Sequence, residues 1–171
     1  KDHKKSYLHF MLYFPNGIGN VFPSWLTGVE MVNGTVVPWD FVYQQKLAKF
    51  LSLLNQAFES AGLIDSIEYI EPAAGGMWGT THLWINPNDL NSWTQAAGCG
   101  SICDQSHDKE CECLGKKFTE GVNAVFDIYM AAFPKLPMMM IGGSCRYPKC
   151  SYSGFGTLLN KYGRSEERRV G

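Results

Sequence analysis

Strand-like apolar runs alternate with amphipathic helical segments, and this alternation limits the possible folds more than any other feature of the sequence. The runs cover residues 6–14, 66–71 and 136–141. Between them, residues 40–61 and 119–133 carry apolar side chains at helical spacing. This order predicts an α/β fold, in which nearly continuous apolar strands form a parallel sheet with helical crossovers.

The ends of the helical segments carry recognisable signals. Asp40 follows Pro38 and is the predicted N-cap, because its carboxylate can accept hydrogen bonds from backbone N–H groups of the first turn. Gly62 is the predicted C-terminal stop, since glycine readily adopts the positive φ that ends many helices. The second helix is expected to end at Pro134, and a third, weaker helix is expected after Ser153.

The loops that follow strands are longer than the loops that follow helices. Residues 15–39 and 72–117 follow strands, whereas the short segments 62–65 and 134–135 follow helices. In a (β/α)8 barrel, the loops after the strands form the active-site face. We therefore predict a fragment of a (β/α)8 TIM barrel with three to four βα units, because a whole barrel needs about 250 residues. A doubly wound open sheet is the alternative, although no phosphate-binding glycine motif follows any strand.

The chain of 171 residues is expected to hold one domain. Residues 1–163 are assigned to the partial barrel, with a Cys-rich loop insertion at residues 94–117. The sequence begins at Lys1 without an initiator Met, and both ends are expected to be truncated. Residues 164–171 resemble translated sequencing adapter and are predicted to be a non-native or disordered tail, with a solvated natural tail as the alternative.

Composition excludes several classes of protein. Hydrophobic residues make up 45% of the chain and charged residues 18%, which excludes an intrinsically disordered chain. The net charge of −1 gives no electrostatic attraction for nucleic acid or for an anionic membrane. No apolar run approaches the roughly 20 residues of a membrane-spanning helix. We therefore expect no nucleic acid, no membrane and no cofactor as partners.

The six cysteines form two groups, namely Cys99, Cys103, Cys111 and Cys113, then Cys145 and Cys150. An even number predicts disulfides in an oxidising compartment, and the simplest pairing has two bridges within residues 99–113 and one Cys145–Cys150 bridge. The alternatives are zinc bound by the first group together with His107, and free thiols. The Asn33-Gly34-Thr35 sequon also fits a secreted or extracellular protein.

Glu71 is the strongest candidate for chemistry. It ends a predicted strand and precedes Pro72 and a Gly-rich loop. Strand alternation places it on the same face as Ile67 and Tyr69, with Glu68 on the opposite face. If the Glu71 face points into the barrel, the carboxyl group lies at the barrel mouth and can act as a general acid. The alternative is a structural carboxylate at the strand end.

Four further side chains are candidates for substrate binding: Trp25, Trp78, His82 and Trp84. The indole rings offer flat apolar faces with a polar N–H, which suits stacking on sugar rings. His82 can form a hydrogen bond with a sugar hydroxyl. The structural alternative is that the tryptophans pack their loops onto the rim of the barrel. His9, inside the first strand, is expected to be a core histidine.

Four segments of the sequence form a pattern known from one class of enzymes. They are Pro23-Ser24-Trp25-Leu26, Val37-Pro38-Trp39-Asp40, Ile67-Glu68-Tyr69-Ile70-Glu71 and Gly76-Met77-Trp78-Gly79-Thr80-Thr81-His82. Together they resemble the middle of clan-A glycoside hydrolases, most closely the bacterial beta-galactosidase-like (β/α)8 enzymes. In those enzymes a strand ending in Glu or Asp is followed, seven residues on, by the tryptophan of a Gly-rich loop. Glu71 and Trp78 keep this offset.

The resemblance implies that Glu71 matches the acid/base position at the end of barrel strand 4. The first and third strands here are then barrel strands 3 and 5. Retaining enzymes of this clan carry a nucleophilic Glu on strand 7, about 5–5.5 Å from the acid/base. This chain holds no candidate for that second Glu. Hydrolysis of β-linked oligo- or polysaccharides is therefore expected of the full-length protein, and the chain alone is expected to be inactive.

Two alternatives from other functional classes stay open. A non-catalytic carbohydrate-binding barrel would keep the tryptophan surface without the carboxylate pair. Thr80 favours this alternative, because it stands where the family loop often has Glu. Ile70 also differs from the Asn that is common before the acid/base residue in this clan. A Cys-rich extracellular domain, in which the Trp and Gly residues are structural, is the other alternative.

Overall fold

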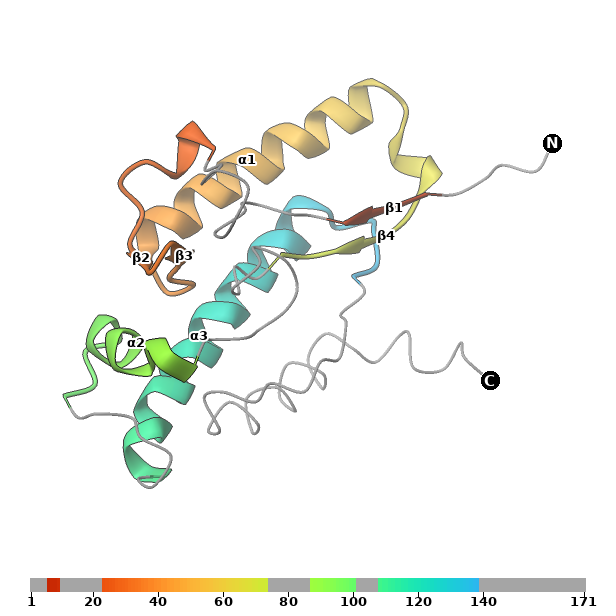
Figure 1. Cartoon of the computed structure of the whole chain (residues 1–171). Coiled ribbons are helices and arrows are strands. Elements are labelled where there is room, and N and C mark those ends of the chain that lie inside the picture. The colour runs from red at the N-terminus through yellow and green to blue at the C-terminus, as the bar shows by residue number, and fades with distance from the viewer. Residues whose placement is uncertain (1–5, 10–22, 74–86, 101–107, 139–171) are drawn as a thin grey trace, which may run out of the picture.

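The computed structural model describes residues 6–9, 23–73, 87–100 and 108–138 (Figure 1). The predicted Cys145–Cys150 bridge, the helix after Ser153 and the tail at residues 164–171 lie outside the described residues. In chain order the elements are β1 (Ser6–His9), the 3-10 helix η1 (Ser24–Leu26), β2 (Met31–Val32), β3 (Thr35–Val36), α1 (Phe41–Ser60), η2 (Ile64–Ser66), β4 (Ile67–Glu71), η3 (Pro87–Asp89), α2 (Leu90–Ala96) and α3 (Asp108–Ala132).

Strands β1 and β4 pair in parallel, with Leu8 opposite Ile70. Beyond β4, a parallel bridge joins Ile70 to Met138, and the Ile70 N–H donates a hydrogen bond of 2.9 Å to the Pro137 carbonyl. These three segments therefore lie side by side in sequence order, and a long helix lies in each connection. The predicted parallel pairing with helical crossovers is confirmed. The described strands form no closed barrel, so the barrel itself stays a prediction.

The N-terminus of α1 is capped as the sequence predicts. The Asp40 carboxylate accepts hydrogen bonds from the backbone N–H groups of Val42 (2.6 Å) and Tyr43 (3.4 Å). These are two of the donors that the first turn of a helix cannot satisfy internally. The second carboxylate oxygen of Asp40 accepts from the Glu30 N–H, so the same side chain also fixes the preceding loop.

The C-terminus of α1 is also closed as predicted. Gly62 has a φ of 67°, in the left-handed region that glycine adopts without steric cost. Its N–H donates to the Glu59 carbonyl, and the Leu63 N–H donates to the Phe58 carbonyl. This pair of hydrogen bonds is the Schellman motif, which satisfies carbonyl groups of the last turn and ends the helix.

Helix α3 begins at Asp108, whereas the sequence pattern predicted a start at Thr119. The predicted Cys-rich loop insertion at residues 94–117 is therefore helical from Asp108 onward. Leu114 and Phe118 extend the apolar stripe of this helix toward its N-terminus, and both side chains are buried. The dense cysteines and charges of this segment obscured the helical spacing of those two residues.

The hydrophobic core lies where α1 and α3 pack against each other and against the short sheet (Figure 1). α1 contributes the fully buried side chains of Tyr43, Leu47 and Leu51, and β4 contributes Ile70. α3 contributes Leu114, Phe118, Val122, Val125, Phe126 and Tyr129. Ile70 lies in the same cluster as the buried residues of both helices, so α1 and α3 lie on the Ile70 face of the sheet.

Three aromatic rings join the segment before α1 to α2 and α3, and we name Trp39, Trp93 and Phe118 the aromatic cluster. Their rings stand edge to face, with centroids 5.8 Å apart for Trp39 and Trp93, 6.0 Å for Trp93 and Phe118, and 6.4 Å for Trp39 and Phe118. Edge-to-face pairs at this distance are favourable because the positive ring edge meets the negative ring face. The aromatic cluster therefore fixes α2 onto α3.

Helix α3 also approaches the segment before α1 very closely at Gly121. A Cβ atom at this position would lie 2.7 Å from the Trp39 backbone nitrogen and 2.8 Å from the Pro38 carbonyl carbon. Gly121→Ala is therefore expected to lower the free energy of unfolding by about 1–3 kcal/mol, the usual cost of overpacking. In an open helix the same substitution would instead stabilise by up to ~1 kcal/mol. Urea unfolding measures the sign and the size of the change.

The matched control for this substitution is Gly100→Ala. A Cβ atom added at Gly100 would have no heavy atom of another segment within 4 Å, so the new methyl group meets only open space. The change in unfolding free energy is expected to stay within about 0.5 kcal/mol. A Gly121→Ala variant as stable as the wild type would contradict the close contact between α3 and the segment before α1.

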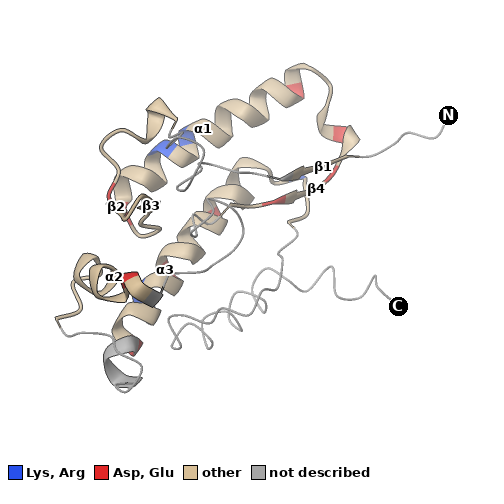
Figure 2. Ribbon diagram, in the orientation of Figure 1, with Lys and Arg blue, Asp and Glu red and all other residues tan. Residues whose placement is uncertain are grey.

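Charged residues are distributed unevenly over the described part of the chain. Figure 2 shows basic residues in the N-terminal half of α1, and acidic residues at its C-terminal end and on β4. Lys135 lies 3.5 Å from Glu59, and both side chains are largely exposed, so this ion pair contributes little stability. Among the described helices, none combines the length and the apolar character needed to cross a membrane.

Candidate active site at the end of strand β4

Glu71 ends β4 and is buried, with only 3% of its surface exposed. The two faces of the sheet differ in what covers them. Ile70 belongs to the hydrophobic core and Leu8 packs against it, so their face is the one covered by α1 and α3. Alternation along each strand then places Tyr7, Tyr69 and Glu71 on the face away from those helices. In a (β/α)8 barrel this is the face that points inward.

An aromatic pair stands on the same sheet face as Glu71. The rings of Tyr7 and Tyr69 are stacked, with centroids 5.3 Å apart and planes inclined by 9°. Tyr7 is 60% exposed, which agrees with its position away from the core. The register pairs His9 with Glu71 at the carboxyl ends of the two strands. The side chain of His9 lies outside the described residues, so its expected core role stays a prediction.

The chain that leaves β4 is held by α3. The Ala73 N–H donates a hydrogen bond of 3.3 Å to the hydroxyl oxygen of Tyr129, and both residues are fully buried. Burial raises the pKa of the Tyr129 hydroxyl far above its ordinary value, and the Ala73 hydrogen bond offsets this only in part. Tyr129 therefore stays neutral across the physiological range and positions the backbone two residues after Glu71.

Tyr129→Phe is expected to lower the free energy of unfolding by about 1–3 kcal/mol, because the buried Ala73 N–H loses this acceptor. The effect depends on pH. The pKa of the Tyr129 hydroxyl is higher in the folded state than in the unfolded state, where it is about 10. The hydroxyl therefore contributes fully to the free energy of unfolding below pH 10, and this contribution is lost as the pH rises further. The wild type loses this contribution above pH 10 and the variant does not, so the stability gap between them narrows there.

Urea unfolding of both proteins between pH 7 and pH 11 measures this gap. Tyr7→Phe is the control, because the Tyr7 side chain is largely exposed and its loss is expected to change stability by less than about 0.5 kcal/mol. A gap for Tyr129→Phe that is absent at neutral pH would contradict the assigned hydrogen bond. A gap that widens above pH 10 would contradict the direction of the pKa shift.

Trp25 is the only one of the four predicted substrate-binding residues that lies among the described residues. It lies in η1, is partly buried, and packs against the hydrophobic core. Its ring is stacked on Phe50 of α1, with centroids 5.4 Å apart and planes inclined by 9°. One ring face is therefore occupied by the protein itself, which favours a structural role. Trp78, His82 and Trp84 lie outside the described residues, and their binding roles stay predictions.

A disulfide joins Cys99 to Cys113, with the Cα atoms 5.9 Å apart, and links the segment after α2 to α3. This bridge lies within residues 99–113, where bridges were predicted from the sequence. Closing a loop of about 15 residues stabilises a fold by roughly 3 kcal/mol, chiefly by restricting the unfolded chain. Disulfide-bonded sulfurs cannot serve as zinc thiolates. Of the other proposed zinc ligands, Cys103, His107 and the Cys111 side chain lie outside the described residues.

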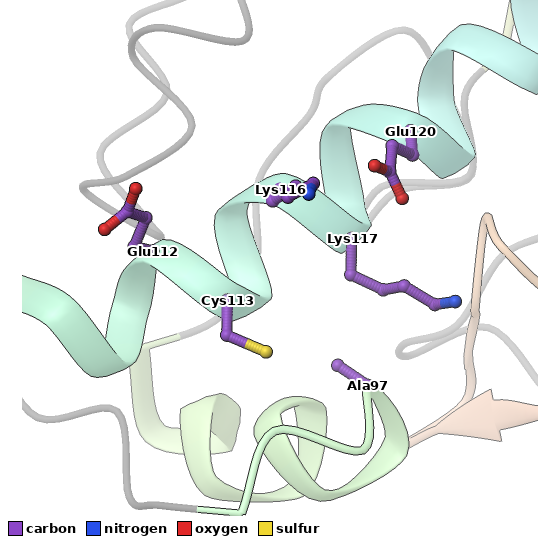
Figure 3. A pocket seen from close by; sticks show the side chains of 6 residues that line it. All are labelled: Ala97, Glu112, Cys113, Lys116, Lys117 and Glu120. Carbon is purple, nitrogen blue, oxygen red and sulfur yellow. The ribbon is translucent and has the colours of Figure 1, made fainter.

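A hollow lies beside this disulfide, and the sequence pattern did not reveal it. It has a volume of about 390 Å³ and is lined by Ala97, Glu112, Cys113, Lys116, Lys117 and Glu120. Figure 3 shows that these side chains come from α3, apart from Ala97 at the end of α2. The spacing of Glu112, Lys116 and Glu120 indicates one face of a helix, but the hollow also needs Ala97 from another segment, which no sequence pattern places there. No group of three metal-ligating side chains gathers within the described part of the chain.

Tyr129 and the hollow are separated along α3. Tyr129 lies nine or more residues beyond the residues that line the hollow, which is about 14 Å or more at 1.5 Å per residue. The described structure therefore holds two separate candidate sites. One is the carboxyl end of β4, and the other is the charged hollow at the disulfide. Comparison with known proteins adds nothing to either site, since no protein-family model, no curated protein and no solved structure matches the chain.

Proposed function

We propose that the protein is a glycoside hydrolase for β-linked sugars, built on a (β/α) barrel, with Glu71 as its general acid/base. The observation that carries this proposal is the position of Glu71. It is a buried carboxyl residue at the carboxyl end of a parallel strand, on the sheet face away from the covering helices. Active sites of (β/α) barrels lie at the carboxyl ends of their strands.

The proposed chemistry uses the carboxyl group of Glu71 in both of its protonation states. As the acid, it gives its proton to the glycosidic oxygen while the bond from that oxygen to the anomeric carbon breaks. As the carboxylate, it then takes a proton from the water that completes hydrolysis. A second carboxylate is required, about 5–5.5 Å away in a retaining enzyme. The resemblance to clan-A enzymes assigns that residue to barrel strand 7.

The parallel, sequence-ordered arrangement of β1, β4 and Met138 supports the barrel, because neighbouring strands of a barrel follow one another in this way. The helices of both crossovers on one face of the sheet support it too. The Cys99–Cys113 disulfide supports a secreted or extracellular location.

A non-catalytic carbohydrate-binding barrel is the second candidate. The observation in its favour is Thr80, which stands where the related loops often have Glu. A Cys-rich extracellular domain without a role in sugar binding is the third candidate, and the stacking of Trp25 on Phe50 favours it. These candidates differ in two measurable properties, which are affinity for oligosaccharides and turnover of glycosides.

Saturation binding to a panel of β-linked oligosaccharides, measured by calorimetry with α-linked isomers as controls, separates the third candidate from the first two. Hydrolysis of the bound oligosaccharides by the protein expressed from its complete gene separates the first candidate from the second. Binding with turnover is the expected result. Binding without turnover would favour the non-catalytic candidate over the hydrolase, and absence of both would overturn the proposed function.

A further inference from the structure

The tip of the β2–β3 hairpin is formed by Asn33 and Gly34. β2 and β3 are antiparallel, with Val32 paired to Thr35 across a two-residue turn. Asn33 has a φ of 47° and Gly34 a φ of 77°. Two consecutive left-handed residues are the requirement of a type I′ turn, in which Asn-Gly is the preferred pair. The turn leaves the Asn33 side chain exposed at the surface.

The same residues form an Asn-x-Thr sequon, and it is the one place in the sequence where Asn is followed two residues later by Ser or Thr without an intervening Pro. We propose that Asn33 is an N-glycosylation site, modified with an oligosaccharide during export of the chain. This goes beyond the proposed hydrolase function and does not depend on it. It requires only that the chain passes through a compartment that holds a lipid-linked oligosaccharide donor and its transferase.

The transfer is a substitution at the first sugar of the donor. The side-chain nitrogen Nδ2 of Asn33 attacks the anomeric carbon of an oligosaccharide carried on a lipid pyrophosphate. A bond forms between Nδ2 and the anomeric carbon, and the bond from that carbon to the pyrophosphate oxygen breaks. The lipid pyrophosphate leaves with the electron pair, and Nδ2 loses one proton to the transferase. No oxidant or reductant is needed.

The folded hairpin can keep the glycan without losing its own contacts. Asn33 Nδ2 donates a hydrogen bond of 2.6 Å to the Asp89 Oδ1 atom at the end of η3. The amide has two hydrogens, and glycosylation removes one of them. The remaining N–H can still donate to Asp89, while the sugar extends from the exposed tip. Modification therefore leaves one N–H for the contact that ties the hairpin to η3.

The burial of Thr35 determines whether Asn33 is modified before or after the hairpin folds. The transferase must reach the Thr35 side chain as well as Asn33, and Thr35 is only 7% exposed in β3. The folded hairpin covers this residue. Modification at Asn33 therefore precedes closure of the hairpin, and the folded chain is not a substrate. This timing gives the proposal a second measurable consequence, besides the presence of the glycan itself.

The experiment is secretion of the chain from a eukaryotic cell line behind a heterologous leader peptide, followed by intact mass and by enzymatic deglycosylation in heavy-oxygen water. Deglycosylation then converts a modified Asn33 to a labelled Asp, which locates the glycan. The wild type and Thr35→Ser are expected to carry one glycan each. Thr35→Val keeps the branched shape of the buried residue but breaks the sequon, and it is expected to carry none.

Asn33→Asp is a second negative variant, because Asp also tolerates positive φ and removes the acceptor nitrogen. Secreted wild type with an unmodified Asn33 would overturn the proposal. A glycan that persists in Thr35→Val would also overturn it, since the modification would then lie elsewhere. Folded, unmodified chain incubated with transferase and donor is expected to stay unmodified, whereas the unfolded chain is expected to be modified. Equal modification of both would contradict the assigned timing.

Discussion

Glu71→Gln is expected to lower kcat for β-glycoside hydrolysis about 10²-fold or more, with oligosaccharide affinity unchanged. The amide keeps the shape of the side chain but has no acidic proton to transfer to the leaving oxygen. General acid catalysis typically contributes 10²–10⁴-fold to the rate. Steady-state kinetics on the protein expressed from its complete gene measure the change, and calorimetry measures the affinity.

The same strand offers a matched control for this experiment. Glu68 lies three residues earlier on β4, is exposed, and stands on the opposite face of the sheet from Glu71. Glu68→Gln is expected to leave kcat and KM unchanged. Equal turnover by Glu71→Gln and the wild type would remove Glu71 from the mechanism. A loss of turnover in both variants would indicate that turnover depends on the negative charge of β4 and not on Glu71 as the general acid.

Trp93→Ala is expected to lower the free energy of unfolding by about 3–5 kcal/mol, the usual cost of deleting a large buried aromatic ring. Trp93 is 2% exposed and contacts both other members of the aromatic cluster, Trp39 and Phe118, edge to face. Its removal leaves a cavity and two edge-to-face contacts unmade, each worth about 0.5–1.5 kcal/mol beyond burial. Urea unfolding, followed by circular dichroism, measures the loss.

Two variants calibrate this result. Trp93→Phe keeps an aromatic ring in the cluster and is expected to lose less than the Ala variant. Leu53→Ala removes an apolar side chain that is 56% exposed on α1, and is expected to change stability by less than about 0.5 kcal/mol. A Trp93→Ala variant as stable as Leu53→Ala would show that the aromatic cluster contributes little to the free energy of unfolding.

Helix α1 could be predicted because its signals are local. Asp40 and Gly62 cap the helix through their own side-chain and backbone chemistry, whatever the rest of the chain does. The apolar period of residues 40–61 likewise depends only on the helix itself. The strands were found by their apolar runs, and β4 begins at Ile67, within one residue of the prediction.

The elements that could not be predicted lie where the same residues are compatible with more than one local structure. The Asn33-Gly34 pair is part of a sequon, and the same dipeptide is also a strong hairpin signal. Residues 90–96 lie in a region rich in Asn, Gly and Trp, where a seven-residue helix has no clear period. The cysteines between residues 99 and 113 suggested a loop and hid the first turns of α3.

The candidate site could be predicted only in part. The position of Glu71 at the end of a strand followed from local pattern, and the structure places this buried residue on the sheet face away from α1 and α3. Tyr129 could not be found in this way, because its partner Ala73 lies 56 residues away in sequence and only packing brings them together. The stacking of Trp25 on Phe50 is likewise a long-range contact. Sequence pattern alone could not distinguish it from an exposed binding surface.

Helix α3 carries two fixed points, Cys113 at the Cys99 disulfide and Tyr129 at the exit of β4. They lie about 24 Å apart along one unbroken helix. Each residue inserted or deleted between them would rotate the second point by about 100° around the helix axis. No single insertion or deletion in this interval can keep both contacts. The two contacts therefore fix the length of the helix between Cys113 and Tyr129, and a change in chain length that preserves both contacts must lie outside this interval.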